Sequence, residues 1–249
     1  MWRQCLRQVL FLHWPIDAQL VRPHIPSELA LDLYGDRAWV SLVLLKMKVW
    51  PHHFASLSLR FSQINVRTYV RLGDIRGIWF FSVHAGHRLA VATARWLTPL
   101  PYRWSPIRYH VGISQARAQA TCRQDCKLEF RVTFSWSLPA SRADRFFSAS
   151  IRAGPVSSAQ PAADDDPNLR SWLLERYHLF ALSRKGRLLI GNFQHAPWSI
   201  FPVWLNSCYV RAAPFGDSAL ASWPSLVHFS PGLEGTFSPF QLAGKAPIR

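Results

Sequence analysis

The chain has 249 residues, of which 49% are hydrophobic and 14% are aromatic. A chain of this length and composition can bury a core without disulfides or metals, which excludes disorder over the whole chain. Its 29 Lys and Arg residues against 14 Asp and Glu give a formal net charge of +15, a balance that favours nucleic acids, anionic membranes or anionic metabolites as partners.

The positive charge is nearly all arginine, and it is scattered along the sequence. No block of five or six like charges occurs. Because a nucleic-acid-binding face needs clustered cations, we expect no specific nucleic-acid partner and only weak, non-specific binding.

The amino-terminal segment carries Arg3 and Arg7 before the apolar run VLFLHWPI. This run is short and lacks a small-residue cleavage site, which is not typical of a signal peptide. The longest stretch without formal charge, residues 188–210, contains several Asn, His and Pro residues that a membrane span would not tolerate. We therefore expect a cytoplasmic protein with no membrane partner.

Strand signals dominate the first third of the chain. Residues 29–49 and 59–83 each contain two apolar runs around a Gly-Asp pair, a pattern that predicts two β-hairpins. In the second hairpin Arg67 and Tyr69 lie on a polar strand face that alternates with an apolar one. The polar face either meets solvent or, in a closed or strongly curved sheet, lines a pocket.

Further along the chain, residues 86–97 favour a helix that ends before two prolines. Small, polar and acidic residues at 153–167 predict a mobile surface loop, and the Asp-Pro pair at its end predicts the start of a second helix. Residues 177–195 predict a third hairpin. With no repeat and no change of composition, residues 1–249 are expected to form one mainly β domain of the α+β class.

Motif searches give mostly negative results. The sequence has no phosphate loop, no dinucleotide fingerprint, no nucleophile elbow and no zinc-protease motif. A single C-x3-C spacing (Cys122 and Cys126) is weak support for zinc, so all four cysteines are interpreted as reduced and structural. We expect no metal and no cofactor.

Nine short motifs occur in an order that resembles the YqjF-like family, a family of unknown function in the acetoacetate decarboxylase superfamily. The resemblance runs from about residue 11 to about residue 240. It implies a barrel-like domain of curved antiparallel sheets around a central cavity, with few outer helices. The motifs are FLHWPID, GDRAWVSLV, NVRTYV, GIWFFS, RLAVATAR, LPYRW, LLERYHLF, HAPW and HFS.

The superfamily resemblance also carries a chemical expectation. Acetoacetate decarboxylases use a Gly-Arg-Glu segment and a Gly-Phe/Tyr-Pro-Lys-Lys motif, whose first lysine forms a Schiff base and whose second lowers the pKa of the first. Aligning Pro101 with the motif proline places Tyr102 at the Schiff-base position and Arg103 at the neighbouring cation. Arg95 then matches the segment's arginine, and Trp96 replaces its glutamate. A phenol cannot form an imine, so the resemblance implies no Schiff-base decarboxylation.

The candidate ligand-binding residues, from this alignment and from the polar strand face, are Arg67, Tyr69, Arg95, Tyr102 and Arg103. For Tyr102 and Arg103 the alternative is a packed corner and a solvated cation, and for Arg67 and Tyr69 it is a solvated strand face.

The candidate catalytic residues are Tyr102, Glu175 and His195. For Glu175, pairing with a buried arginine is the simpler role, and for His195 it is a packed turn. The leading hypothesis is a protein that binds a small carboxylate- or carbonyl-bearing ligand in a central cavity. The alternatives are an enzyme that uses non-imine acid/base chemistry on such a ligand, and a non-specific nucleic-acid binder.

Overall fold

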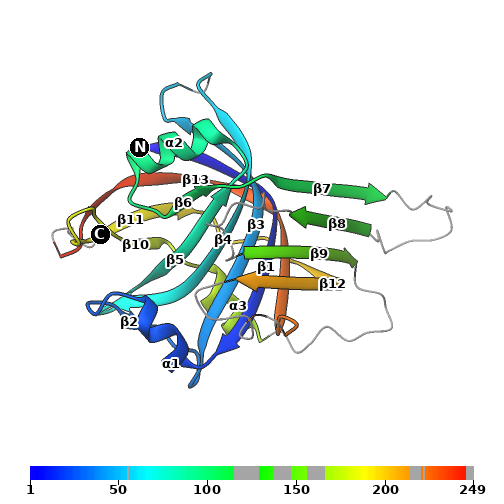
Figure 1. Cartoon of the computed structure of the whole chain (residues 1–249), viewed down its shortest axis with the longest axis horizontal. Helices are drawn as coiled ribbons and strands as arrows, with labels where there is room; N and C mark the ends of the chain where they lie inside the picture. Colours follow the sequence, from blue (N-terminus) through cyan, green and yellow to red (C-terminus); the bar gives the residue numbers. More distant parts are fainter. Residues whose placement is uncertain are drawn as a thin grey trace.

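The computed structural model describes residues 1–54, 56–114, 129–136, 147–155, 166–212, 220 and 222–244, which contain a sheet of 13 strands and few helices (Figure 1). The strands are β1 (Trp2–Ile16), β2 (Ala30–Leu31), β3 (Ala38–Pro51), β4 (Leu59–Leu72), β5 (Ile75–Ala85), β6 (Tyr102–Trp104), β7 (Ile107–Ser114), β8 (Glu129–Trp136), β9 (Phe147–Pro155), β10 (His178–Leu182), β11 (Leu188–His195), β12 (Phe201–Ala212) and β13 (Leu226–Leu242).

Seven of these strands close into a barrel in the order β1-β3-β4-β5-β10-β11-β13. The barrel closes because the long strand β13 pairs with β1 as well as with β11. Within this barrel of seven strands, neighbouring strands are antiparallel except for β5 and β10, which are parallel. The expected barrel-like, mainly β fold is confirmed.

Glycines with positive φ form the turns of two predicted hairpins. Gly73 (φ 57°) joins β4 to β5, and Gly186 (φ 72°) lies in the turn between β10 and β11, so both hairpins are confirmed. The hairpin predicted at 29–49 is only partly correct. Its turn forms at residues 34–37, but β2 pairs with β4 instead of β3. The sequence pattern identified both strands but not their partners.

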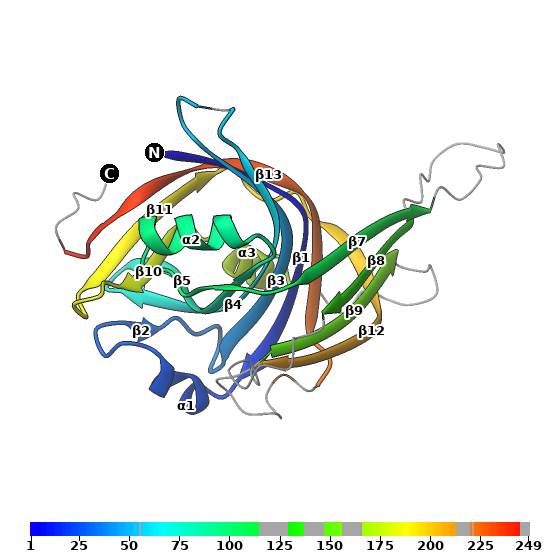
Figure 2. The same cartoon turned by 45° about the horizontal axis from the view of Figure 1, so that its top comes forward.

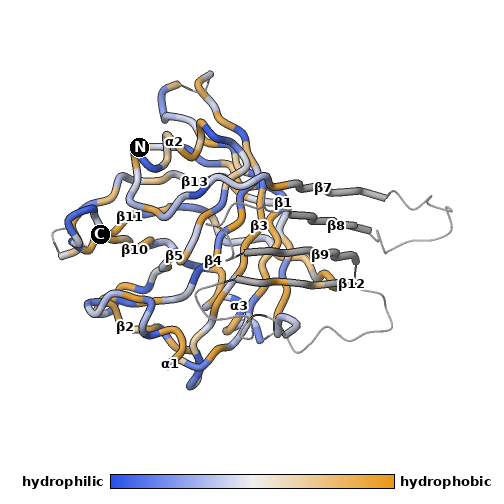
Figure 3. The backbone as a smooth tube through the Cα atoms, viewed as in Figure 1, coloured by the Kyte–Doolittle hydropathy of each residue, from blue (hydrophilic) through white to orange (hydrophobic). Residues whose placement is uncertain are grey.

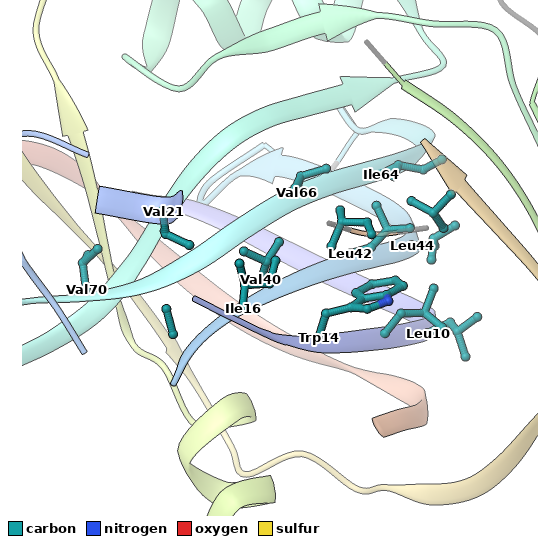
Figure 4. Close-up of a cluster of buried hydrophobic side chains, with 14 of the residues drawn as sticks. Leu10, Trp14, Ile16, Val21, Val40, Leu42, Leu44, Ile64, Val66 and Val70 are labelled. Carbon is teal, nitrogen blue, oxygen red and sulfur yellow. The ribbon is translucent and has the colours of Figure 1, made fainter. Parts of the chain in front are cut away.

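Outside the barrel, β12, β9, β8 and β7 form an extension of the sheet that projects to one side in Figures 1 and 2. Between the barrel wall and this extension lies an apolar cluster. Most of its side chains come from β1, β3 and β4, and others come from β12, β13, β10 and α1. Figure 3 shows hydrophobic residues concentrated at the centre of the molecule, and part of the cluster is drawn in Figure 4. Strands β1, β3 and β4 are therefore buried on both faces, and the labelled members are Leu10, Trp14, Ile16, Val21, Val40, Leu42, Leu44, Ile64, Val66 and Val70.

Short helices cover the ends of the barrel. Helix α1 (Ala18–Val21) and a 3₁₀ turn (Arg22–His24) follow β1, and α2 (Arg88–Leu97) lies across the opposite end (Figure 2). Helix α3 (Pro167–Leu174) begins at Asp166, whose carboxylate accepts a hydrogen bond from the Asn168 N–H. The helices predicted before the two prolines and after the Asp-Pro pair are both confirmed.

Some sequence predictions fall where the structure gives no description. Residues 156–165 of the predicted loop 153–167 lie outside the described residues, and so do Cys122 and Cys126. The loop's first three residues belong to β9 instead. Cys5 and Cys208 are free thiols. Among the described helices, none is long and apolar enough to cross a membrane.

Candidate functional site

The barrel encloses a cavity of about 170 Å³, lined by inward-facing side chains from all seven strands and from α2. Its wall is mostly apolar and includes Val43, Leu45, Phe80 and Leu97. A smaller number of polar side chains, described below, interrupt this wall. A cavity of this size suits a small organic molecule about as large as benzene or slightly larger.

Arg67 of β4 lines the cavity and is 8% exposed. Its guanidinium lies 5.7 Å from the ring centre of Phe11 and 5.9 Å from that of Tyr69. It forms no ion pair with a carboxylate of the described residues, and its Nε has no hydrogen-bond partner among them. Arg67 is therefore a buried cation without a counter-ion among the described residues, and such a charge is costly unless an anion pairs with it.

Arg176 follows α3 and also lines the cavity, but its charge is compensated. Its Nη1 donates a hydrogen bond of 2.5 Å to the buried carboxylate of Asp32, and its Nε donates one of 2.6 Å to the Trp172 carbonyl. Burial lowers the pKa of Arg176, against the opposing effect of Asp32. Its Nη2 is buried and has no hydrogen-bond partner among the described residues.

Three further polar side chains line the cavity: Gln63 and Asn65 of β4 and Tyr102 of β6. The Tyr102 hydroxyl donates a 3.3 Å hydrogen bond to the Gln63 Oε1, and burial raises the pKa of Tyr102 to about 12. Tyr102 is therefore a neutral hydroxyl at ordinary pH. Asn65 is 3% exposed, and its Oδ1 has no hydrogen-bond partner among the described residues.

His195 of β11 also lines the cavity, on the wall across the barrel from β4. Its ring stacks on Tyr177, with 4.6 Å between ring centres, and Nδ1 lies 2.7 Å from the Ala196 carbonyl. Since a carbonyl only accepts hydrogen bonds, Nδ1 carries the proton in the neutral ring, and Nε2 is the basic nitrogen. His195 thus combines the predicted packed turn with a position in the cavity wall.

Glu175 is engaged elsewhere. Its two oxygens accept hydrogen bonds from the Tyr177 hydroxyl (2.8 Å) and the Trp198 backbone N–H (2.9 Å). The prediction that Glu175 pairs with a buried arginine is wrong in its partner, because the buried arginine next to it, Arg176, pairs with Asp32. Asp32 was missed because it lies about 140 residues away in sequence and no local pattern marks it.

Two predicted ligand-binding arginines do not fit this cavity. Arg95 and Arg103 are exposed, and neither lines it. On β6, consecutive side chains face opposite sides of the strand, so Tyr102 points inward and Arg103 outward. On α2 the cavity side is formed by Thr93, Ala94 and Leu97, and Arg95 lies on another face.

The lysines that could replace the missing amine also face away. Lys46 and Lys48 of β3 line a groove on the outside of the barrel together with Cys5 and Arg7. The inward positions between and beside them carry Leu45 and Met47. Of the lysines that the structure describes, none lines the cavity.

A buried polar network borders Arg67. The His13 Nδ1 lies 2.6 Å from the Ser41 hydroxyl, which lies 2.6 Å from the Tyr69 hydroxyl. The pKa of His13 is lowered well below its usual value by burial, by His228 and by Arg67. His13 is therefore neutral and leaves the Arg67 charge uncompensated. Tyr69, predicted to bind ligand, is fully buried in this network and does not line the cavity.

The closed barrel with an internal cavity places the chain in the class of acetoacetate decarboxylase-like folds. It matches the enduracididine biosynthesis enzyme MppR, solved with HEPES buffer bound (TM-score 0.60, 14% identity, 97% of this chain and 87% of that chain). It also matches an acetoacetate decarboxylase-like enzyme from Sphingomonas wittichii RW1 (0.56, 13%, 96% and 93%) and acetoacetate decarboxylase from Legionella pneumophila (0.54, 13%, 96% and 87%).

Sequence comparison identifies the family within this class. Residues 3–234 match the model of DUF2071, described as an uncharacterized conserved protein, and the chain belongs to this family. A relative, the uncharacterized protein YqjF of Bacillus subtilis (strain 168), is 30% identical over 199 residues, which cover 79% of this chain and 73% of that protein. The resemblance to the YqjF-like family drawn from the sequence motifs is confirmed.

Proposed function

We propose that this protein binds a small organic carboxylate in the barrel cavity, with the guanidinium of Arg67 as the anion anchor and without a Schiff-base lysine. The observation that carries this proposal is the burial of Arg67 in a cavity of molecular size, with no carboxylate partner in the part of the chain that the structure describes. A bound carboxylate forms charge-assisted hydrogen bonds to the guanidinium and restores the compensation that the free protein lacks.

The other cavity groups define the rest of the ligand. The Tyr102 hydroxyl and the Gln63 amide form a hydrogen-bonded pair in the cavity wall, and Asn65 lines the wall next to Gln63 and Arg67 on β4. These groups suit a carbonyl or hydroxyl oxygen near the carboxylate, and the apolar wall suits a short hydrocarbon part. The structural neighbour MppR, solved with pyruvate in one complex, holds a ligand of this class in the same fold.

The test is calorimetric titration with a panel of short 2-oxo and 3-oxo acids and their methyl esters. We expect the acids to bind and the esters to bind much more weakly. Arg67→Met should weaken acid binding about 30-fold or more, because a hydrogen bond to a charged group contributes about 2 kcal/mol. Arg103→Ala is the matched control, since Arg103 is an exposed arginine outside the cavity lining. Equal losses in both variants would refute Arg67 as the anchor.

Borohydride treatment in the presence of these acids tests the second half of the proposal. We expect no covalent adduct by intact mass, because the described lysines lie outside the cavity lining and position 102 is a tyrosine. A lysine adduct coupled to release of carbon dioxide would show that imine chemistry occurs.

The second candidate function is acid/base catalysis on the same ligand, and the position of His195 favours it. Its Nε2 is the basic nitrogen in a cavity that also contains a buried cation, Arg67. A cation beside a carbonyl ligand stabilises an enolate formed by proton removal. This function predicts exchange of ligand C–H protons with D₂O, measured by NMR, that His195→Gln abolishes while binding persists. Exchange at the uncatalysed rate would argue for binding alone.

A further inference from the structure

We propose that the mouth end of the barrel docks on an anionic lipid bilayer. The proposal stands independently of the ligand in the cavity. It is carried by two adjacent features: an apolar rim at the mouth, and a basic patch on the outer face of the strands that lead to it.

The apolar rim consists of Phe54, Leu57, Leu89, Trp96 and Leu97. Its most exposed members are Trp96 (79%) and Leu57 (66%). Leu57, from the β3–β4 loop, and Leu97, from α2, also line the cavity, so the loop and the helix meet at its mouth. Figure 2 shows α2 across this end of the barrel. Large exposed apolar side chains gathered at one site mark a docking surface.

The two exposed apolar side chains of α2 outside the cavity lining share one helical face. Leu89 and Trp96 are seven residues apart, two turns of the helix, while the opposite side contributes Ala94 and Leu97 to the cavity wall. Arg88 and Arg95, also seven residues apart, lie together along one side of this face. Aromatic and aliphatic side chains beside arginines are typical of helices that lie in a membrane interface.

The basic patch consists of Arg7, Lys46, Lys48 and Arg60, which line one groove on the outside of β1, β3 and β4, together with the neighbouring Arg3. One carboxylate, Glu234 of β13, also lines the groove and pairs with Arg3 at 3.4 Å, so the cations remain in excess. These residues are distant in sequence, but the register places Arg7 opposite Lys46 and Lys48 opposite Arg60. Like charges directly opposite each other destabilise a sheet. An anionic surface would relieve the repulsion between Lys48 and Arg60, and each basic residue near such a surface contributes about 1 kcal/mol of binding.

The patch leads directly to the rim. The Lys48–Arg60 pair lies one rung before the last β3–β4 pair, Val49–Leu59, from which the loop with Phe54 and Leu57 continues. At about 3.3 Å per residue, this cation pair lies within a Debye length of the loop. The rim can therefore enter the headgroup region while the patch contacts anionic headgroups, and two such signals are what stable peripheral binding requires.

Two other occupants fit less well. In a symmetric dimer through this surface, each basic patch would lie near its own copy, because such an interface uses the same surface on both subunits. A single-stranded nucleic acid would need exposed rings among the cations for base stacking. The ring within the patch, Trp50, is 8% exposed and lies under Lys48 and Arg3. The sequence showed no segment able to span a membrane, and we therefore expected no membrane partner. The proposal departs from that expectation because the fold brings cations that are scattered in the sequence together on one surface.

The experiment is flotation of the full chain with vesicles of phosphatidylcholine alone or with 30% phosphatidylglycerol. We expect binding to the anionic vesicles that falls with added salt, and little binding to the neutral ones. Lys48→Gln/Arg60→Gln should lower the partition coefficient roughly 30-fold, the effect of two cations at about 1 kcal/mol each. The charge-matched control is Arg37→Gln/Arg71→Gln, which changes two exposed arginines at the opposite end of the barrel.

The apolar contribution is tested with Phe54→Ser/Trp96→Ser, two rim residues outside the cavity lining. This variant should lose at least about tenfold in binding, while Trp223→Ser should not. Trp223 is the control because it is also an exposed tryptophan (54%) and lies away from the rim. Its neighbours Ser222 and Ser225 contact Trp14 and His13, near the end of β1 that is distant from the rim. Equal loss in both variants, or equal binding to neutral and anionic vesicles, would overturn the proposal. So would absence of binding, or light scattering that shows the rim variant converting an oligomer to a monomer.

Discussion

Replacing each of the two buried arginines of the cavity should change the stability of the protein in opposite directions. Arg67 (8% exposed) has no carboxylate partner among the described residues, whereas Arg176 (4% exposed) pairs with the buried Asp32. Methionine has a similar volume and no charge. Arg67→Met therefore removes a charge without a carboxylate partner among the described residues. Arg176→Met leaves the buried Asp32 carboxylate with only the largely exposed Arg76, 3.8 Å away, as a partner. We expect the first change to stabilise the free protein and the second to destabilise it.

The magnitudes follow from the cost of buried charges. Breaking a buried pair by removing one partner costs about 3–5 kcal/mol, so Arg176→Met should lower the free energy of unfolding by that amount. Arg67→Met loses two cation–π contacts at 5.7 and 5.9 Å, each near the distance limit and contributing at most about 0.5–1 kcal/mol. The relief of desolvation amounts to several kcal/mol. A net gain of about 1–3 kcal/mol is expected for Arg67→Met.

Urea unfolding at pH 7 measures both effects, with the slope against urea used to check that the unfolded states are comparable. Destabilisation of Arg67→Met by as much as Arg176→Met would refute the reasoning. It would mean that Arg67 stabilises the ligand-free protein, and its burial would then not require a bound anion as its explanation.

Two further predictions concern the barrel itself. Gly232 has φ 128°, and a Cβ there would lie 2.0 Å from the Leu6 carbonyl oxygen where β1 pairs with β13. Gly232→Ala should therefore lower the free energy of unfolding by more than about 3 kcal/mol. Gly35 has φ 60° and open space around it, so Gly35→Ala should lower the free energy of unfolding by only about 1–2 kcal/mol. Urea unfolding of both distinguishes a clash at the closure from a general glycine effect, and equal costs would contradict it. The pKa values of Tyr102 and Tyr177 are both raised to about 12, so stability should be fully present below pH 10 and decline between pH 10 and 12 as the unfolded phenols ionise. Tyr102→Phe should flatten this decline in the free energy of unfolding, and an unchanged slope would count against burial as its cause.

Local sequence patterns predicted much of the secondary structure. The β4–β5 and β10–β11 turns depend on glycines with positive φ, and α3 on an Asp cap followed by proline, all of which are readable from a few neighbouring residues. The pairing of strands was not readable in this way. The partner of β2 is β4, and β1 pairs with β13 more than 200 residues away, contacts that depend on the closure of the whole barrel.

The candidate site was predictable where one strand determined it. The alternation around Arg67 showed that Arg67 and Tyr69 share a face, but whether that face meets solvent or a cavity is decided by barrel closure. Asp32, the partner of Arg176, comes from the segment between β2 and β3, so no spacing in the sequence marks this pair. The basic patch was missed for the same reason, since strand register and not sequence proximity brings Arg7 opposite Lys46.

The motif LPYRW shows why the cation that faces the cavity is not the one that the superfamily alignment indicated. The superfamily alignment placed an imine position and a neighbouring cation at residues 102 and 103, which are consecutive on β6. Consecutive strand residues face opposite sides, so only Tyr102 faces the cavity and Arg103 points outward. The buried cation comes instead from Arg67 on β4, two residues along the strand from Asn65 and four from Gln63. A cavity with a fixed cation, neutral donors and no amine from the described lysines has the groups for holding a carboxylate and lacks the nucleophile for imine formation.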